Sequence, residues 1–512
     1  MTTLIGPSSR SSTDGLGLPR DSVLAPASTG TLSWNENLVR LLHIGAEIEH
    51  ALMVQYLFAA YTIGGDQIPD DPAIRAMISR WRSNIIAIAK EEMGHFLTVQ
   101  NLLKLVGSDV VLRRENFPWD TDYYPFKFAL KPFSWETLCC YLYAEMEPEV
   151  SAPDRPGKSA VPAFKPAFTA LTPEEREEIT KIACQNATEG HANTVGALYK
   201  QIIDVASDRT RIPDSVFRDN SYSSQASWDD WGRGYKPDPR MIDPSGNIIG
   251  PKPGTMPMVA LHPPASARQA FVLIDRAATR TEMVKALRAL AAQGEAPSLR
   301  VDATGEPSHF DRFSEIFHEY KHLVKDKGWS PSRQVVSNPI THDVVGATDM
   351  TLITNKVALP WARLCNLRYR MLLMYLAHTF RLEHRVGFGA PNLRSMLMHK
   401  VFGEMYNLKT LSGVLVDMPA GPADDPARAG PPFELPYMIG LPTTESDTWQ
   451  LHRSLLENAQ LLVLDIFRVY ENSSIKPGVG YLRSLQELDR KSLEWIDQLV
   501  KRFDPSMEYS SR

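Results

Sequence analysis

The sequence predicts an all-α protein, and three observations carry this prediction. Apolar residues recur at the three- and four-residue spacing of amphipathic helices, capping residues and Gly or Pro stops bound these segments, and no convincing series of strands or internal repeat occurs. Hydrophobic residues make up 43% of the 512 residues, an ordinary globular composition that argues against a disordered chain.

The first two expected helices are long. Ser33 and Glu36 have the spacing of a capping box at the start of the first helix, and Gly64 closes it. The second helix is expected from near Pro72 to Gly107. Both carry apolar stripes with helical spacing, so we expect each to bury one face in a core.

Two further helices are expected before residue 205. The third begins after Ser134 and ends before Pro148. A fourth is expected across residues 172–204, where Thr172 and Glu175 have the spacing of a second capping box.

The composition changes between residues 205 and 265, where Gly, Pro, Asp and aromatic residues replace the helical pattern. The segment IDPSGNIIG, residues 242–250, has the pattern of a small hairpin. Because a long irregular segment in an ordered chain is usually functional, we expect this insertion to form a lid or one wall of a binding site. The aromatic side chains expected to line a substrate pocket are Tyr56, Tyr222, Trp228, Trp231 and Tyr235.

Helical patterns return after the insertion. The expected helices span residues 280–294, 306–326, 368–385, 448–471 and 483–503, with an irregular loop at 417–436. The expected organisation is a flexible N-terminal arm at 1–32, a bundle at 33–330, and a C-terminal helical region packed on the bundle at 331–512.

Charge and cysteine content exclude several classes of protein. The net charge is −5 and no run of Lys or Arg occurs, so neither nucleic acid nor an anionic membrane is an expected partner. No stretch of about 18 apolar residues is present, and the N-terminus lacks the apolar core of a signal peptide. The four cysteines lack metal-ligand spacing and are few for so long a chain, which favours a cytoplasmic location.

The motif Glu-x-x-His occurs five times, so helix phase must separate the instances. Glu92 and His95 continue an unbroken stripe on the second helix, whereas Glu91 is expected to lie off it. The stripe consists of Ile78, Trp81, Ile85, Ile88, Glu92, His95, Val99 and Leu102. Since an unpaired buried carboxylate is very costly, Glu92 must meet a cation, a metal or a proton.

The same test on the other helices selects further inward-facing side chains. Glu49 and Glu145 lie on the apolar stripes of the first and third helices, and Glu306 and His309 lead into the stripe of the helix at 306–326. Because proline is tolerated in a first turn, Pro307 places Glu306 at the very start of that helix. Glu47 of the Glu47/His50 pair faces away from its stripe, and the pairs Glu315/His318 and Glu319/His322 are expected at solvated positions.

One Glu from each of two helices and Glu-x-x-His from two others form the ligand set of a carboxylate-bridged di-iron bundle. The candidate ligands are Glu49, Glu92, His95, Glu145, Glu306 and His309. Four carboxylates nearly neutralise two divalent ions, so such a cluster is tolerated inside a core. For any single pair the alternative is a structural hydrogen bond, but four helices contributing in phase favour two Fe ions per chain with O₂ as co-substrate.

Six segments, taken in order, resemble one protein family: HIGAEIEHALMVQYLFAAY, EEMGHFLTVQNLL, TVGALYKQI, AAQGEA, EPSHFDRF and AGPPFELP. They are similar to segments of ferritin-like proteins of the iminophenyl-pyruvate dimer synthase type, a family that includes the ferritin-like part of a violacein-pathway enzyme. The resemblance spans residues 35–440 and implies a ferritin-like bundle, with a long insertion and an additional C-terminal helical region in this chain. It also implies specialised metabolism, an amino-acid-derived substrate, and metal ligands at Glu49, Glu92, His95, Glu306 and His309.

One departure from the family lies in the segment TVGALY, where relatives usually carry Glu at the position of Ala197. If that Glu is a ligand in relatives, either Glu145 or a neighbouring residue replaces it here. His191 is the nearest candidate, because it shares a stripe with Val195 and Leu198 on the expected fourth helix. A purely structural role is the alternative interpretation of His191. Glu189 and Glu295 are lesser candidates.

The sequence therefore predicts a non-haem di-metal, O₂-dependent oxidase or oxygenase in specialised metabolism. A ferritin-like metal-binding or scaffold protein without substrate turnover is the alternative, although the long aromatic insertion fits it poorly. A mononuclear or metal-free variant, with Ala197 marking a lost ligand, is a third. The expected partner is a small-molecule substrate; the sequence does not identify the electron donor and leaves a homodimer open.

Overall fold

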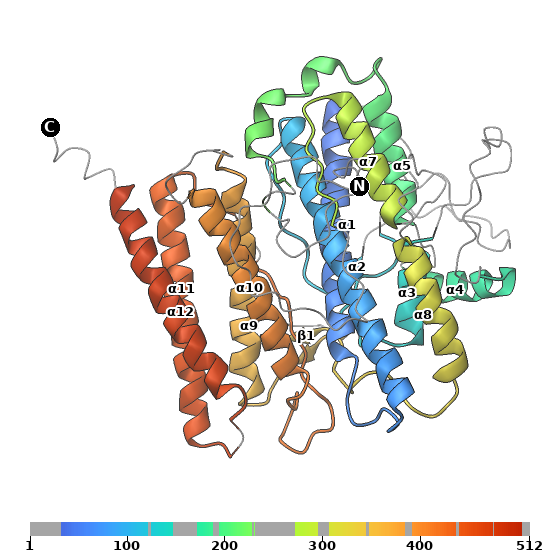
Figure 1. Cartoon of the computed structure of the whole chain (residues 1–512), viewed down its shortest axis with the longest axis vertical. Helices are drawn as coiled ribbons and strands as arrows, with labels where there is room; N and C mark the ends of the chain where they lie inside the picture. Colours follow the sequence, from blue (N-terminus) through green and yellow to red (C-terminus); the bar gives the residue numbers. More distant parts are fainter. Residues whose placement is uncertain are drawn as a thin grey trace, which may run out of the picture.

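The computed structural model describes most of the chain between residues 32 and 503 (Figure 1). The described residues are 32–120, 124–146, 171–187, 194–227, 230, 272–294, 307–344, 348–383, 392–436, 440–474 and 476–503. The predicted N-terminal arm, the predicted hairpin and most of the predicted insertion therefore lie outside the described residues.

Helices dominate the described residues, which confirms the predicted all-α fold. The α-helices are α1 (Trp34–Thr62), α2 (Pro72–Leu105), α3 (Trp135–Ala144), α4 (Pro173–Gln185), α5 (Val195–Ser207), α7 (Arg280–Gly294), α8 (His309–Leu323), α9 (Ala358–Thr379), α10 (Leu393–Leu415), α11 (Glu445–Glu471) and α12 (Val479–Arg502). Two 3-10 helices, η3 (Asp214–Val216) and η4 (Asp219–Ser224), and two parallel strands, β1 (Pro339–Ile340) and β2 (Thr351–Leu352), are also present.

Side-chain caps start several helices where the sequence predicts them. Ser33 and Glu36 form a capping box at α1, and Thr172 and Glu175 form another at α4. Ser134 accepts a hydrogen bond from a backbone N–H in the first turn of α3. Each cap satisfies N–H groups that a helix start leaves unpaired, and it stabilises the helix by about 1 kcal/mol.

The first region of the molecule is a bundle built around α1 and α2 (Figure 1). α1 packs along α2 and also contacts α5, α7 packs on α5, and α8 packs on α3. α2 contacts both α7 and α8, and every residue of α2 from Glu91 to Leu103 is buried. The polar side chains in this part of α2 must therefore find partners on neighbouring helices.

An extended segment, residues 272–277, crosses α2 at Gly94. A Cβ atom at Gly94 would lie 2.4 Å from the carbonyl oxygen of Leu273, so only glycine fits at this crossing. Asn101, two turns further along α2, donates hydrogen bonds of 2.8 Å to the carbonyl oxygens of Ala226 and Asp275. These contacts fix Ala226, inside the predicted insertion, and the segment that follows the insertion against the central helix.

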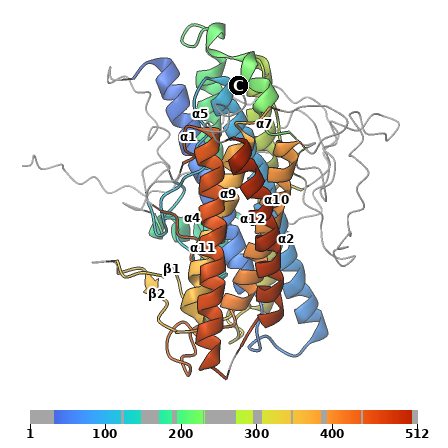
Figure 2. The same ribbon diagram turned by 90° about the vertical axis from the view of Figure 1, so that its left-hand side faces the viewer.

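The second region contains α9, α10, α11 and α12, which lie side by side next to the first bundle (Figures 1 and 2). α9 packs on both α10 and α11, and α11 packs on α12. No described helix combines the length and the apolar composition needed to cross a membrane.

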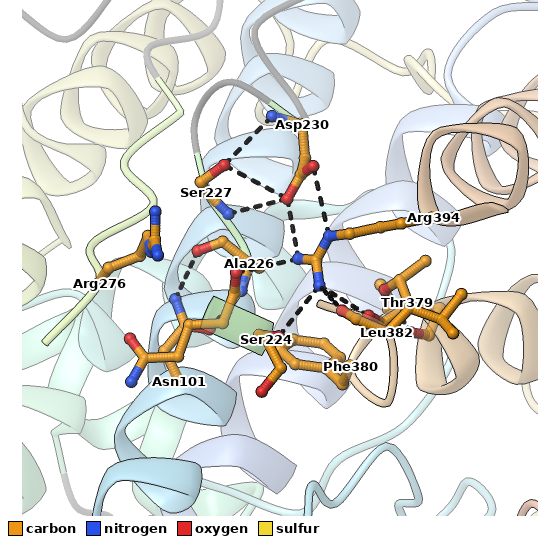
Figure 3. A network of polar contacts seen from close by, with 12 residues as sticks. Asn101, Ser224, Ala226, Ser227, Asp230, Arg276, Thr379, Phe380, Leu382 and Arg394 are labelled. Atoms are coloured by element: carbon orange, nitrogen blue, oxygen red, sulfur yellow. Dashed lines mark hydrogen bonds and ion pairs between the residues drawn. The ribbon is translucent and has the colours of Figure 1, made fainter. Parts of the chain in front are cut away.

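Arg394, at the start of α10, ties the two regions together (Figure 3). Its guanidinium donates to the carbonyl oxygen of Ser224 in η4 at 3.1 Å, and to those of Thr379 and Leu382 at the end of α9, both at 2.7 Å. Asp230 neutralises the guanidinium through a hydrogen bond of 2.9 Å. A single buried cation therefore joins the first residues of the predicted insertion to two C-terminal helices.

The AGPPFELP segment makes a second connection between the regions. The carbonyl oxygen of Leu435 in this segment accepts a hydrogen bond of 2.8 Å from Asn116, which follows α2, and Glu434 accepts one of 2.6 Å from Asn366 of α9. Nearby, the hydroxyl group of Tyr369 on α9 lies 2.5 Å from Nε2 of His50 on α1. The C-terminal helices thus contact α1 through buried polar groups as well as apolar packing.

Several helices differ from the prediction; α9, for example, spans Ala358–Thr379, whereas the predicted helix spans 368–385. The predicted helix at 172–204 is two helices: α4 ends at Gln185, and α5 starts at Val195 with Thr194 as its own N-cap. A capping residue starts a new helix here because its side chain replaces the backbone partner that a continuing helix would supply. α10 has no counterpart among the predicted helices, since Gly403 and Gly413 interrupt its pattern.

Candidate metal centre

Five of the six predicted metal ligands come together in the middle of the first bundle. They are Glu49 of α1, Glu92 and His95 of α2, Glu145 at the residue that ends α3, and His309 at the first residue of α8. Each has an exposed fraction of 3% or less. The sixth, Glu306, lies outside the described residues.

Glu92 lies between the two histidines. Its Oε2 atom is 2.9 Å from His95 Nδ1, and its Oε1 atom is 2.9 Å from His309 Nδ1. The two imidazole rings are stacked with their centroids 5.4 Å apart. Both rings therefore present the same nitrogen to one shared carboxylate.

A second carboxylate stands beside each imidazole. Glu49 Oε2 is 3.5 Å from His95 Nδ1, and Glu145 Oε2 is 3.7 Å from His309 Nδ1. Ligand atoms of Glu49, Glu92 and His95 lie within 4.8 Å of one another, and so do those of Glu92, Glu145 and His309. The centre thus consists of two three-residue groups, the His95 group and the His309 group, which share Glu92.

A buried tyrosine hydroxyl group orients each outer carboxylate. Tyr199 of α5 donates a hydrogen bond to Glu49 Oε1, and Tyr56 of α1 donates one of 2.6 Å to Glu145 Oε1. In both carboxylates the other oxygen, Oε2, is the one that faces the imidazole. The two tyrosines therefore hold one oxygen of each carboxylate and leave the second for the centre.

The outward nitrogens of the two rings have different partners. His95 Nε2 lies 3.0 Å from Oε1 of Gln293 on α7. His309 Nε2 lies 3.0 Å from Glu91 Oε2, and Arg312 binds the Glu91 carboxylate through both of its terminal nitrogens. Each outward nitrogen faces an acceptor, so a neutral ring donates its proton outward and turns the Nδ1 lone pair toward the centre.

Two buried atoms in the centre lack a hydrogen bond. Neither Glu49 Oε2 nor His309 Nδ1 forms one with any described residue. His309 Nδ1 lies close to Glu92 Oε1, but this contact does not have the direction of a hydrogen bond. Three buried carboxylates beside two imidazoles leave negative charge that protons or metal ions must balance. Carboxylate oxygens and imidazole nitrogens are common ligands of iron and similar ions, so the residues present fit a pair of metal ions.

Protons balance this charge in the metal-free protein. Burial raises the pKa of the Glu49 carboxyl to about 8, and the Glu92 carboxylate adds to the increase. Burial disfavours a charged His95, but the Glu92 and Glu49 carboxylates outweigh it and raise the pKa of His95 to about 10. Burial also opposes protonation of His309, yet Glu92 and Glu145 raise its pKa well above the usual value.

Glu92 has the opposite shift. Burial alone would raise the pKa of Glu92, but the His309 and His95 rings hold it well below its usual value. The shared residue is thus the carboxylate of the centre that stays ionised most readily.

The end of α7 closes over the His309 group. A Cβ atom at Gly294, the last residue of α7, would lie 3.2 Å from Glu145 Oε2 and 3.9 Å from His309 Nδ1. Alanine there would force Glu145 to move by a few tenths of an ångström. Glycine therefore leaves the ligand atoms room at this point.

The prediction that Glu91 lies off the buried surface of α2 is wrong. Glu91 is 2% exposed because α2 is covered on all sides at this level, so the phase of one stripe cannot separate buried from exposed positions. Burial opposes its ionisation, but Arg312 and His309 hold the pKa of Glu91 below its usual value. It is an ionised outer partner of a candidate ligand.

α8 starts later than predicted. Ser308 and Asp311 form a capping box, so the helix begins at His309 and Pro307 precedes the cap. Glu306 lies outside the described residues, and its role as a ligand stays a prediction.

The structure places the remaining predicted residues as follows. Tyr56 contacts Glu145 in the centre itself, whereas Tyr222 is 40% exposed and its ring lies under the Arg276 guanidinium. The residues outside the described part are Trp228, Trp231, Tyr235, His191, Glu189 and Glu295. Ala197 is on α5, two residues before Tyr199. Glu145 belongs to the His309 group.

The sequence prediction did not identify Tyr199, Gln293 or Arg312. Tyr199 and Gln293 lie within the TVGALYKQI and AAQGEA segments that carry the family resemblance, so those segments contained a signal. Arg312 is on the inner face of α8 one turn after His309, and a buried arginine needs an anionic partner.

Residues 42–228 match the family model described as Ferritin-like. The match covers α1 to η4 and includes Glu49, Glu92, His95 and Glu145. It confirms the predicted resemblance to ferritin-like proteins over this part of the chain.

The chain is also similar to two curated proteins of the predicted type. It is 26% identical to dichlorochromopyrrolate synthase of Lentzea aerocolonigenes over 81% of this chain and 37% of that protein. It is 29% identical to 2-imino-3-(indol-3-yl)propanoate dimerase of Chromobacterium violaceum over 28% of this chain and 17% of that protein. The matched parts thus span well under half the length of either relative.

Among solved structures, a ferritin-like protein from Caulobacter vibrioides aligns with 73% of this chain and 95% of its own, at 15% identity. The TM-score of 0.35 is too low to indicate a shared arrangement of helices.

Proposed function

We propose that this chain, which contains a ferritin-like domain, is a di-iron enzyme that uses O₂ to oxidise a small amino-acid-derived metabolite. The observation that carries the proposal is the pair of three-residue groups that share Glu92. Their carboxylates and imidazoles come from four helices and supply five of the six donors expected of a carboxylate-bridged di-iron bundle.

The proposed ligands divide between two ions. Glu49 and His95 would hold one ion, Glu145 and His309 the other, and Glu92 would bridge them. Their three carboxylates supply three of the four negative charges that two divalent ions need, so Glu306 or a solvent hydroxide would complete the balance. Bound iron would supply the electrons that activate O₂.

The protein would orient the ligands and exclude water. Hydrogen bonds from Tyr56 and Tyr199 hold the outer carboxylates, and each contributes about 1 kcal/mol. Since the five described ligands are at most 3% exposed, bulk water is kept from the ions.

The relatives support a class of substrate. One is named as a dimerase of an imino acid that carries an indole ring. We therefore propose an aromatic 2-imino acid, or its oxidised derivative, as the substrate of this chain, in specialised metabolism.

Metal analysis and O₂ consumption test this function. The full chain is purified without chelator, loaded with Fe(II) under anaerobic conditions and then exposed to O₂. We expect about two irons per chain and O₂ uptake that rises when a freshly generated aromatic imino acid is added. One iron or none contradicts the di-iron assignment, and two irons without substrate-dependent uptake favour a metal-binding protein without turnover.

A further inference from the structure

The outward-facing nitrogens, Nε2, of the two histidines contact chemically different groups. His95 Nε2 faces the neutral side-chain amide of Gln293, at 3.0 Å. His309 Nε2 faces the carboxylate of Glu91, also at 3.0 Å. On the side that faces the centre the two groups are alike. Each has one imidazole and one carboxylate that belongs to that group alone, and both include Glu92.

Glu91 is fixed more firmly than a single hydrogen bond would fix it. Arg312 reaches its Oε1 atom at 3.4 Å and also binds Oε2, the oxygen that meets His309. Glu91 and Arg312 are 2% and 4% exposed, so little solvent competes for these contacts. The pair is neutral as a whole, and it therefore gives His309 an ionised acceptor without adding net charge to the centre.

An ionised acceptor acts on a metal-bound imidazole in two ways. It fixes the ring orientation and the tautomer, and it increases the electron donation of the ring to the metal. A neutral amide also fixes the ring orientation, but it increases the electron donation from the ring to the metal less than a carboxylate does. Removal of such an outer partner typically lowers metal affinity by roughly 10- to 100-fold.

We propose that the two metal positions are inequivalent, and that Glu91, held by Arg312, makes the His309 position the tighter one. This inference rests on the proposed two-metal centre. Glu91 and Gln293 are positioning residues, since each acts through a histidine.

Calorimetric titration of the metal-free full chain with Co(II) alone tests the proposal. We expect two binding steps in the unaltered protein. His309→Ala should abolish the tight step and His95→Ala the weak one, which assigns each step to its group.

Outer-partner variants then separate the two positions. The double variant Glu91→Met/Arg312→Met removes the pair together, so that no buried charge is stranded. It should weaken the tight step by roughly 10- to 100-fold and leave the weak step unchanged. Gln293→Met should affect only the weak step. If the double variant fails to fold, Glu91→Gln, which keeps a polar partner for both neighbours, should weaken the tight step in the same sense.

A matched control is available on the same two helices. Arg80 of α2 pairs with Glu319 of α8, away from both histidines. Arg80→Met/Glu319→Met removes a pair of the same residue types, although a partly exposed one, and should change neither step.

The possible results separate the inference from the proposed function. Two equal steps in the unaltered protein, or equal weakening of both steps by the Glu91/Arg312 variant, would overturn the inference and leave the two-metal centre standing. Fewer than two Co(II) ions per unaltered chain would instead contradict the proposed function.

Discussion

Each of the two helical regions buries a cluster of acidic side chains, and the clusters differ in how their charge is balanced. In the C-terminal region, Arg368 donates to Glu404 Oε1 at 3.1 Å and to Asp489 Oδ1 at 2.9 Å, and it also binds Asp489 Oδ2. Asn407 donates to Glu404 Oε2 at 3.0 Å. All four carboxylate oxygens of this cluster therefore accept hydrogen bonds from the protein.

The part of the first bundle that the structure describes places no such permanent cation beside the three carboxylates of the centre. Among the described residues, the groups at ion-pair distance from Glu49, Glu92 and Glu145 are the two imidazoles. Glu49 Oε2 forms no hydrogen bond with a described residue. Burial of acidic residues thus does not by itself indicate a metal site; the shortage of fixed positive charge does.

The largest expected effect follows from removal of the shared carboxylate. Because Glu92 belongs to both groups, Glu92→Ala should lower the metal content from about two ions per chain to nearly none. Metal analysis by mass spectrometry measures the change. Glu404→Gln in the C-terminal cluster is the control and should keep its metal, so equal loss in both variants would break the distinction between the clusters.

We expect the C-terminal cluster to contribute to the free energy of unfolding and not to metal binding. Asp489→Asn weakens two charged hydrogen bonds of Arg368, which keeps Glu404 as its partner, and should lower the free energy of unfolding by about 1.5–3 kcal/mol. Denaturant unfolding of the metal-free protein measures this loss, and the metal content should not change.

Glu49→Gln provides the matching variant in the first bundle. Because the pKa of Glu49 is raised to about 8, the residue is mostly protonated at neutral pH in the metal-free protein, and glutamine resembles that form. The free energy of unfolding should therefore change little. A loss as large as that of Asp489→Asn would show that Glu49 is balanced by a fixed cation after all.

Metal binding should depend on pH because metal ions must displace the protons of the centre. The pKa of His95 is raised to about 10 and that of Glu49 to about 8, so both hold protons at neutral pH. Affinity should rise with pH between about 6 and 8, by about tenfold per pH unit for each proton released. Calorimetry in buffers of different ionisation enthalpy counts these protons, and an affinity independent of pH would contradict the assigned shifts.

The smallest effect on metal binding is expected from Tyr56→Phe. The variant removes the 2.6 Å hydrogen bond to Glu145 Oε1 but keeps the carboxylate, so metal affinity should fall by about 1 kcal/mol. Only the His309 position should weaken in a Co(II) titration. Weakening of the His95 position as well would show that Tyr56 supports the bundle as a whole.

Helix phase predicted the inner part of the centre from the sequence because each candidate ligand interrupts an apolar stripe on its own helix. Glu49, Glu92, His95 and Glu145 could be selected in this way, one helix at a time. Glu91 could not, since α2 is buried all round at this level. The start of α8 was predicted too early because Ser308 and Asp311 form a capping box after Pro307.

The outer partners depend on contacts between helices far apart in the chain. Gln293 contacts His95, which lies 198 residues earlier in the sequence, and Tyr199 contacts Glu49, which lies 150 residues earlier. No local pattern encodes such a pairing, although the all-α fold and the caps of α1, α3 and α4 follow from local rules.

Anomalous X-ray scattering at the iron edge, from crystals of the iron-loaded full chain, tests the two-metal centre most directly. We predict two peaks, one between Glu49, Glu92 and His95 and one between Glu92, Glu145 and His309, with none beside Arg368. A single peak, or no peak next to Glu92, would contradict the account.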